Sequence, residues 1–147
     1  MLILETDASD SFWGVVLKAV SIDPENLQKE EEILEILKEH KSADELICGY
    51  NSEKFKPNEL NYIIFEKELL AIKNGIKRFQ IYLAPIKFLI RTDNKVVRDF
   101  LKKKRVENNY RRVKCSNYIS QYSFEIVHIN TNKNILADYL SRHPNGY

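Results

Sequence analysis

The chain has 147 residues, 44% of them hydrophobic and 30% charged, which are the size and composition of one globular domain. It lacks an apolar run long enough to cross a membrane, so no membrane partner is expected. Met1 leads directly into a strand-like stretch, so we expect no secretory signal. The two cysteines, Cys48 and Cys115, lie far apart, as is typical of reduced thiols in a cytosolic protein.

The formal net charge of +2 conceals two segments of opposite charge. Residues 22–45 contain nine acidic side chains and three lysines, whereas residues 95–114 contain nine basic and two acidic side chains. Such a concentrated cationic stretch favours a polyanionic partner such as nucleic acid. A solvated surface explains it equally well on charge alone.

The first half of the chain predicts three strands, an insertion and a long helix. Hydrophobic patterns indicate strands at residues 1–7, 12–20 and 45–52. Between the second and third strands, residues at about 22–44 predict an acidic helical insert. A long helix is expected from about 58 to 82, with Asn58 as its N-cap and Pro85 beyond its end.

The second half of the chain alternates between strand and helix patterns. It predicts a strand at 86–92, helices at 95–104 and 109–120, and a strand at 122–129. A last helix is expected to end near residue 142, with Asn132 as its cap. This order predicts a single α/β domain, residues 1–147, with an antiparallel hairpin at one side of its sheet and parallel strands beyond.

Two predicted strands end in the same dipeptide, Thr-Asp. "LILETDAS" at residues 2–9 delivers Asp7, and "FLIRTDN" at residues 88–94 delivers Asp93. A single aspartate at the end of a strand is ordinary turn chemistry, because its side chain bonds nearby backbone amides. A second aspartate in the same position suggests that the two carboxylates share a role. Other acidic residues at unfavourable positions would support this interpretation.

Glu68 is the carboxylate that the pattern of the long helix does not explain. Apolar residues at three- and four-residue spacing mark the side of this helix that faces the core: Ile64, Ile72, Ile76, Phe79 and Leu83. Glu68 lies on the same stripe, where an ionised carboxylate is costly, whereas Glu66 illustrates the surface positions available to glutamate. Glu68 could lie at the edge of the stripe and reach solvent, or it could pair with a buried lysine. The remaining alternative is that it has a functional role.

If Asp7, Glu68 and Asp93 converge, their negative charges repel one another and their pKa values rise. A divalent cation removes that cost, and ligands that are all oxygen atoms favour Mg²⁺ or Mn²⁺. An open carboxylate site that retains water positions is suited to metal-assisted phosphoryl transfer. The three carboxylates therefore predict a magnesium site.

Four motifs in order resemble one family. "TDAS", "EKELLAI" at 66–72, "FLIRTDN" and "NILADYLSR" at 134–142 are similar to the ribonuclease H domain of a reverse transcriptase, of the gypsy-type retroelement and plant pararetrovirus (caulimovirus) group. The resemblance covers nearly the whole chain except the acidic insert. It implies a ribonuclease H-like fold: a mixed five-stranded sheet in which strands 1–3 are antiparallel and strands 1, 4 and 5 are parallel, flanked by helices.

The resemblance implies an activity and four acidic residues. The activity is metal-dependent hydrolysis of the RNA strand of RNA·DNA hybrids during reverse transcription, giving 5′-phosphate and 3′-hydroxyl ends. Catalytic and metal-binding positions fall on Asp7, Glu68, Asp93 and Asp138. They would hold two Mg²⁺ ions, for which Mn²⁺ can substitute, one activating a water and the other stabilising the leaving oxygen. Asp138 rests on the resemblance alone, because Ile135, Leu136, Tyr139 and Leu140 predict an apolar face directed away from it.

Candidate substrate contacts follow from position and charge. Ser9 and Asn94 are next to predicted catalytic positions and could bond 2′-hydroxyl groups of RNA, although both are also ordinary turn residues. Sequence-independent phosphate contacts are predicted from the basic segment, at Lys102, Lys103, Lys104, Arg105, Arg111, Arg112 and Lys114. Several of these side chains are expected to be solvated surface charges that make no contact with substrate.

Some family members use a histidine on the loop before the last helix. Here that loop is the short "NTNKN", which has none, so proton transfer would fall to water, substrate phosphate or the carboxylates. The resemblance also implies a polymerase domain in the same polyprotein, and a location in the host cytoplasm within viral or virus-like particles. The alternative is a catalytically silent module that binds nucleic acid or scaffolds the polymerase. The sequence does not indicate an oligomeric state.

Overall fold

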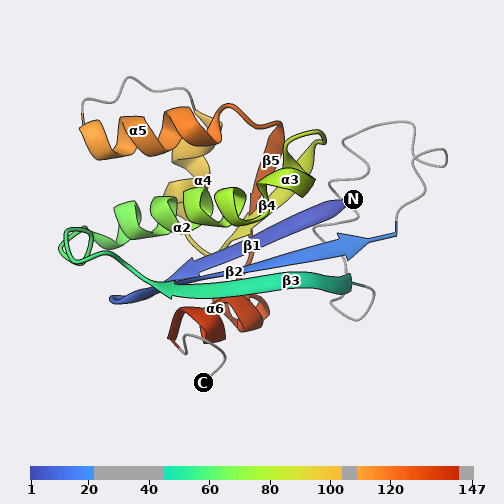
Figure 1. Ribbon diagram of the computed structural model, residues 1–147, viewed down its shortest axis with the longest axis horizontal. Coiled ribbons are helices and arrows are strands. Elements are labelled where there is room, and N and C mark those ends of the chain that lie inside the picture. Colours follow the sequence, from blue (N-terminus) through green and yellow to red (C-terminus); the bar gives the residue numbers. More distant parts are fainter. Residues whose placement is uncertain (22–44, 104–108, 143–147) are drawn as a thin grey trace.

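The computed structural model describes residues 1–21, 45–103 and 109–142. Within these ranges the strands form one sheet of order β3-β2-β1-β4-β5 (Figure 1). The strands are β1 (Leu2–Ala8), β2 (Phe12–Val20), β3 (Glu45–Lys54), β4 (Phe88–Thr92) and β5 (Phe124–His128). β1, β2 and β3 pair antiparallel, whereas β4 pairs parallel with both β1 and β5. The mixed sheet predicted from the sequence is confirmed.

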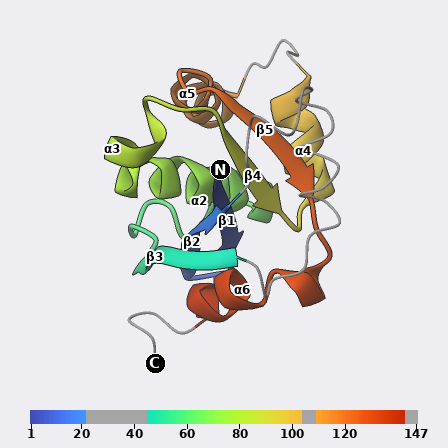
Figure 2. The same cartoon turned by 90° about the vertical axis from the view of Figure 1, so that its right-hand side faces the viewer.

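Helices cover both faces of the sheet, as the two perpendicular views in Figures 1 and 2 show. One face carries α2 (Ile64–Arg78), α3 (Gln80–Leu83), α4 (Lys95–Lys102) and α5 (Tyr110–Ile119). The other face carries α6 (Ile135–Arg142), which follows a short 3₁₀ turn, Thr131–Lys133. Within the described ranges, no helix combines the length and the apolar character that a membrane crossing requires. The predicted acidic helical insert at about 22–44 lies outside the described residues.

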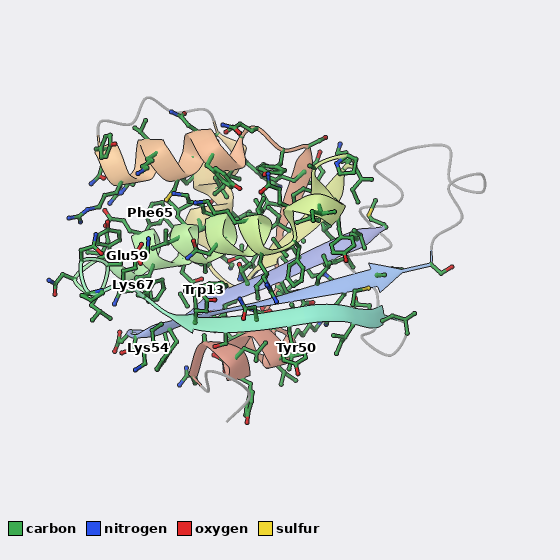
Figure 3. The ribbon with its side chains drawn as sticks, viewed as in Figure 1. Trp13, Tyr50, Lys54, Glu59, Phe65 and Lys67 are labelled. Atoms are coloured by element: carbon green, nitrogen blue, oxygen red, sulfur yellow. The ribbon has the colours of Figure 1, made fainter. Side chains whose placement is uncertain are left out.

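The core has a separate apolar layer on each side of the sheet. Between the sheet and α2, Ile72 and Ile76 are fully buried against residues such as Val15. Gly75 allows this close approach, because a Cβ atom there would lie 2.7 Å from the Val15 side chain. On the other side, Val16 packs against Ala137 and Leu140 of α6. Figure 3 shows Trp13 on the α2 side of β2 and Tyr50 on the α6 side of β3.

The long helix predicted over 58–82 is shorter and interrupted. The segment before Ile64 forms turns instead, in which the Glu59 carboxylate accepts a 2.8 Å hydrogen bond from the backbone N–H of Lys56. The predicted N-cap, Asn58, is therefore wrong, and Ile63 occupies the cap position without a side-chain hydrogen bond. A break at Phe79 separates α2 from α3, and the Phe79 ring lies against Gly49 of β3. The core-facing stripe holds except at Ile64, which is 52% exposed.

The side that the last helix turns to the sheet only partly matches the predicted face: Leu140 is buried and Leu136 is partly buried, whereas Ile135 and Tyr139 are exposed. Its buried residues are Ala137, Leu140 and Ser141, whereas Ile135 is 69% exposed and Tyr139 is 42% exposed. Backbone atoms of Ala137 and Ser141 lie against Gly14 of β2, and Leu140 packs beside them against Val16. The predicted cap, Asn132, is also wrong, since it lies within the 3₁₀ turn.

Four buried charged side chains connect four strands, and no pattern in the sequence predicted this group. Glu5 and Glu45 accept hydrogen bonds from both Lys18 and Arg91, at nitrogen-to-oxygen distances between 2.6 and 3.2 Å. All four side chains are at most 10% exposed. Two acids and two bases make the group formally neutral, which is the condition under which buried charges are tolerated. The group links β1 to β4 immediately before the positions of Asp7 and Asp93.

Arg91→Met should lower the free energy of unfolding by about 3–5 kcal/mol, because it leaves two buried carboxylates short of a partner. Lys87→Met is the matched control, since it breaks an ion pair to Glu125 in which both side chains are about two-fifths exposed. An exposed pair of this kind contributes at most about 1 kcal/mol. Denaturant unfolding measures both values, and equal losses in the two variants would contradict a structural role for the buried group.

Candidate active site

Asp7 and Asp93 come to the same end of the sheet on neighbouring parallel strands. Glu5 of β1 is paired with Arg91 of β4, and each aspartate follows its partner in this pair by two residues: Asp7 lies within β1, and Asp93 is the first residue after β4. Residues two apart in a strand project from the same face, so the register of these two strands brings the aspartates together. Asp7 is only 4% exposed, and Asp93 is half-buried.

Glu68 reaches the two aspartates from α2, on the opposite face of the sheet from α6. It is 4% exposed, which excludes the solvent-facing alternative. Its carboxylate accepts a hydrogen bond from the backbone of Ala8, whereas its Oε2 atom is buried without a hydrogen-bond partner. Carboxylate oxygens of Asp7, Glu68 and Asp93 lie within 4.8 Å of one another. The predicted convergence is therefore observed.

Asp138 approaches the same group from α6. Because the buried side of α6 is formed by Ala137 and Ser141, Asp138 lies at the border of that side and its side chain contacts Asp7. The hydroxyl of Ser141 donates to Oδ2 of Asp7 at 3.2 Å, which fixes the orientation of that carboxylate. Arg142 forms an ion pair with Asp138, with Nε 3.2 Å from Oδ1.

The position of α6 depends on Gly14, which is directly opposite Asp7 in the β1–β2 pair. A Cβ atom on Gly14 would lie 2.7 Å from the carbonyl oxygen of Ala137 and 2.8 Å from the backbone nitrogen of Ser141. Hydrogen bonds hold the helix in this close contact: the hydroxyls of Ser9 and Ser52 donate to carbonyls of α6, and the buried Asn134 donates to the carbonyl of Thr6. This contact brings Asp138 within reach of Asp7.

Burial and mutual repulsion raise the pKa values of the carboxylates. Burial, followed by the charge of Asp93 and contact with Asp138, raises the pKa of Asp7 from 3.8 to about 7. Burial and the charges of Asp7 and Asp93 raise the pKa of Glu68 from 4.5 to about 10. The pKa of Asp93 is also raised, by burial and then by the charge of Asp138. The protein alone therefore retains protons at this site near neutral pH.

The carboxylates face an open hollow of about 380 Å³. It is lined by Asp7, Ala8, Ile64, Glu68, Asp93, Asn94, Lys95, Thr131, Asp138 and Arg142. Two cationic side chains that were not predicted from the sequence, Lys95 and Arg142, also line the hollow. Lys95 is the first residue of the basic segment, so the concentration of positive charge there could have indicated it. The signal for Arg142 was its position at the end of the "ADYLSR" motif.

The side chains in this hollow fit a divalent cation. Their donor atoms are carboxylate oxygens, and the only described group of three or more potential ligands consists of Asp7, Glu68 and Asp93. The unpartnered Oε2 atom of Glu68 is a buried acceptor that a cation would satisfy. Hard oxygen donors favour Mg²⁺ or Mn²⁺ over softer metals.

The two predicted contacts for 2′-hydroxyls occupy different environments. Asn94 lines the hollow and caps α4, with its Oδ1 atom accepting from the backbone of Val97 at 3.0 Å. Ser9 is in the β1–β2 turn, where its hydroxyl is engaged by the carbonyl of Ser141. Substrate contact by either residue stays a prediction.

Arg111 and Arg112 are engaged within the protein. Both pair with Glu66, with nitrogen-to-oxygen distances of 3.4 and 3.6 Å. Glu66 is only 6% exposed, so its description as a surface glutamate was wrong. The guanidinium groups also lie over aromatic rings, Arg111 at 4.2 Å from the centroid of Tyr62. This cluster joins α5 to the start of α2, two residues before Glu68.

The other predicted phosphate contacts are spread along the basic segment. Lys102 and Lys103 are exposed at the end of α4, and Lys114 lies on α5. Lys104 and Arg105 lie outside the described residues. No described contact tests these predictions.

Comparison with known proteins identifies the class to which this fold belongs. The chain resembles LC11-RNase H1, solved in complex with RNA/DNA hybrid, with a TM-score of 0.61 at 17% identity, over 95% of this chain and 93% of that one. The fold is thus that of ribonuclease H. Residues 1–122 match the family of RNase H-like domains found in reverse transcriptase, and the chain belongs to that family.

Its relatives include polyproteins of plant pararetroviruses. The chain is 43% identical over 143 residues to the enzymatic polyprotein of Figwort mosaic virus (strain DxS), covering 96% of this chain and 19% of the polyprotein. It is 42% identical over 151 residues to that of Cauliflower mosaic virus (strain NY8153), covering 98% of this chain and 19% of the polyprotein. The chain thus spans about a fifth of the length of these curated relatives. The resemblance found in the sequence motifs is confirmed.

The stability of the metal-free protein should decrease as the pH rises from about 4 to about 7 through the titration of Asp7. The pKa of Asp7 is higher in the folded state than the unfolded value of 3.8, so the folded protein binds this proton more tightly and loses that advantage with rising pH. Added Mg²⁺ should oppose the decrease. Thermal unfolding of the parent and Asp7→Asn tests this, and identical pH profiles with and without Mg²⁺ would contradict it.

Gly14→Ala should displace α6 and lower the free energy of unfolding by about 1–3 kcal/mol. It should also reduce the rise in melting temperature caused by Mg²⁺, because Asp138 and Ser141 move away from Asp7. Gly49→Ala is the control: its Cβ would lie 2.8 Å from the Phe79 ring, far along the sheet from the carboxylates. Equal responses to Mg²⁺ in the two variants would show that the contact at Gly14 does not position the site.

Proposed function

We propose that this domain is a metal-dependent endonuclease that hydrolyses the RNA strand of RNA·DNA hybrids during reverse transcription. Its products would carry 5′-phosphate and 3′-hydroxyl ends. Membership in the family of RNase H-like domains of reverse transcriptases supports this proposal. The observation that carries it is the convergence of Asp7, Glu68 and Asp93 within 4.8 Å, with Asp138 in contact with Asp7.

The four carboxylates would hold the divalent cations, Mg²⁺ or Mn²⁺. Bound cations would supply Lewis acidity, which lowers the pKa of a water ligand and stabilises the leaving 3′ oxygen. Asp7 is best placed to serve more than one cation, since it contacts each of the other three carboxylates. Ser141 holds the Asp7 carboxylate in one orientation, and Arg142 does the same for Asp138.

Substrate would approach through the open side of the hollow. Lys95 and Arg142 at its rim would attract the backbone phosphates around the scissile bond. Asn94 uses its oxygen to cap α4, which leaves its amide nitrogen available to donate to a 2′-hydroxyl group. This donor would help to distinguish RNA from DNA at the cleavage site.

We also propose the partners and the location that the sequence resemblance implies. Because the matching polyproteins are about five times as long as this chain, we expect a polymerase domain in the same polyprotein. The corresponding location is the host cytoplasm, within viral or virus-like particles. A catalytically silent module is a weaker explanation, because a scaffold would gain nothing from four carboxylates that repel one another.

Asp93→Asn should reduce cleavage of a labelled RNA·DNA hybrid in Mg²⁺ by at least about 100-fold, since metal coordination supplies several kcal/mol of transition-state stabilisation. Asp99→Asn is the matched control, because Asp99 is exposed on α4 and pairs only with Arg98 among the described ion pairs. The products are resolved on a denaturing gel. Equal cleavage by the parent and Asp93→Asn would remove Asp93 from the site, and an inert parent, even when joined to its polymerase, would support the silent module.

A further inference from the structure

A second hollow, of about 400 Å³, lies between α2 and α5 and is lined by cationic, aromatic and amide side chains. The two helices run side by side (Figure 1), and the hollow opens on their surface. Lys73, Lys77 and Lys114 contribute three ammonium groups to it. None of the described residues that line it is acidic. We call it the α2–α5 hollow.

Lys77 and Lys114 lie close enough to Lys73 to affect its pKa. Burial lowers the pKa of Lys73, and the charges of Lys77 and Lys114 lower it further. Among the described residues, none of the three lysines forms an ion pair. The charge of Glu59, which lines the adjoining hollow, acts on Lys73 in the opposite sense. Three like charges in one concave site whose described lining has no acidic side chain form an anion-binding arrangement.

An aromatic side chain lies within this cationic cluster. The Nζ atoms of Lys73 and Lys77 lie 5.7 and 5.3 Å from the centroid of the Tyr118 ring. Tyr110 lines the same hollow and is 75% exposed, so its ring is accessible to a base. Lysines beside an exposed aromatic ring are a combination by which proteins hold nucleic acid, through phosphates and base stacking.

The cationic surface continues across α2 into an adjoining hollow. Lys73 and Lys77 line both hollows, and the second one adds Lys54, Lys56 and Arg78. Two acidic side chains, Glu53 and Glu59, also line that second hollow, so acidic groups border the cationic surface there but not among the described residues of the α2–α5 hollow.

We propose that the α2–α5 hollow is a second nucleic-acid contact, which binds backbone phosphates away from the cleavage centre. Lys73 and Lys77 follow Glu68 on α2 by five and nine residues, roughly 7.5 and 13.5 Å along the helix axis. When a hybrid is bound at the carboxylates, the backbone phosphates of the hybrid, or of a strand that extends from it, could therefore contact these lysines along α2. The choice of nucleic acid as the ligand rests on the proposed function. The anion-binding character rests on Lys73, Lys77 and Lys114 themselves.

The first test is the salt dependence of hybrid binding, measured by fluorescence anisotropy in the Asp93→Asn background so that no cleavage intervenes. Lys77→Gln combined with Lys114→Gln should lower the slope of log affinity against log salt concentration by about 2, because each phosphate contact contributes roughly 0.9. Lys87→Gln combined with Lys133→Gln removes the same net charge elsewhere and should leave the slope unchanged. Equal slopes for both double variants would overturn the proposal.

The second test uses the protein without substitutions in the hollow. An amine-reactive reagent followed by mass spectrometry should show that hybrid protects Lys73, Lys77 and Lys114 from modification, whereas Lys87 reacts equally with and without hybrid. Protection by a polyglutamate peptide but not by hybrid would assign the hollow to an acidic protein segment and overturn the proposal. Because both tests measure binding, protection in a protein that does not cleave would refute the proposed nuclease activity and leave this contact standing.

Discussion

The mutual repulsion of carboxylates in a place where water cannot screen them is the constraint on which this structure depends. Asp7 and Glu68 are both 4% exposed, and each raises the cost of ionising the other. A protein gains no stability from such an arrangement unless protons or cations are bound there. The rest of the fold can be understood as the means by which carboxylates from distant parts of the sequence are kept together against this repulsion.

Rigid contacts on both faces of β2 hold the helices that carry these groups. Gly75 lets α2 lie against Val15 on one face of β2. On the other face, the absence of a side chain at Gly14 lets α6 lie directly against the strand. The buried charges around Arg91 lock β1 to β4, so that Asp7 and Asp93 stay in register. These contacts are either close approaches between a helix and the backbone of a strand or buried ion pairs. Because both kinds of contact are rigid, the site is organised before any ligand binds.

The sequence was most informative where one physical rule acts alone. Strand alternation predicted the sheet, and Glu68 was found because a carboxylate on an apolar stripe violates the hydrophobic pattern. Predictions from the sequence were wrong where tertiary contacts override local patterns. Ile64 is exposed although it fits the stripe. In α6, Ala137 is buried and Ile135 is exposed, because the close approach at Gly14 brings the backbone of Ala137 against β2. The pairing of Glu66 with Arg111 spans 45 residues, and no local period could indicate it.

Calorimetric titration of Mg²⁺ into the protein at neutral pH, repeated in buffers of different ionisation enthalpy, tests the central claim most directly. Since Asp7 and Glu68 have pKa values of about 7 and about 10 without metal, Mg²⁺ must displace protons from them. The account predicts that protons are released on binding and that the release falls when Glu68 is replaced by glutamine. Binding of Mg²⁺ with no proton release would contradict it.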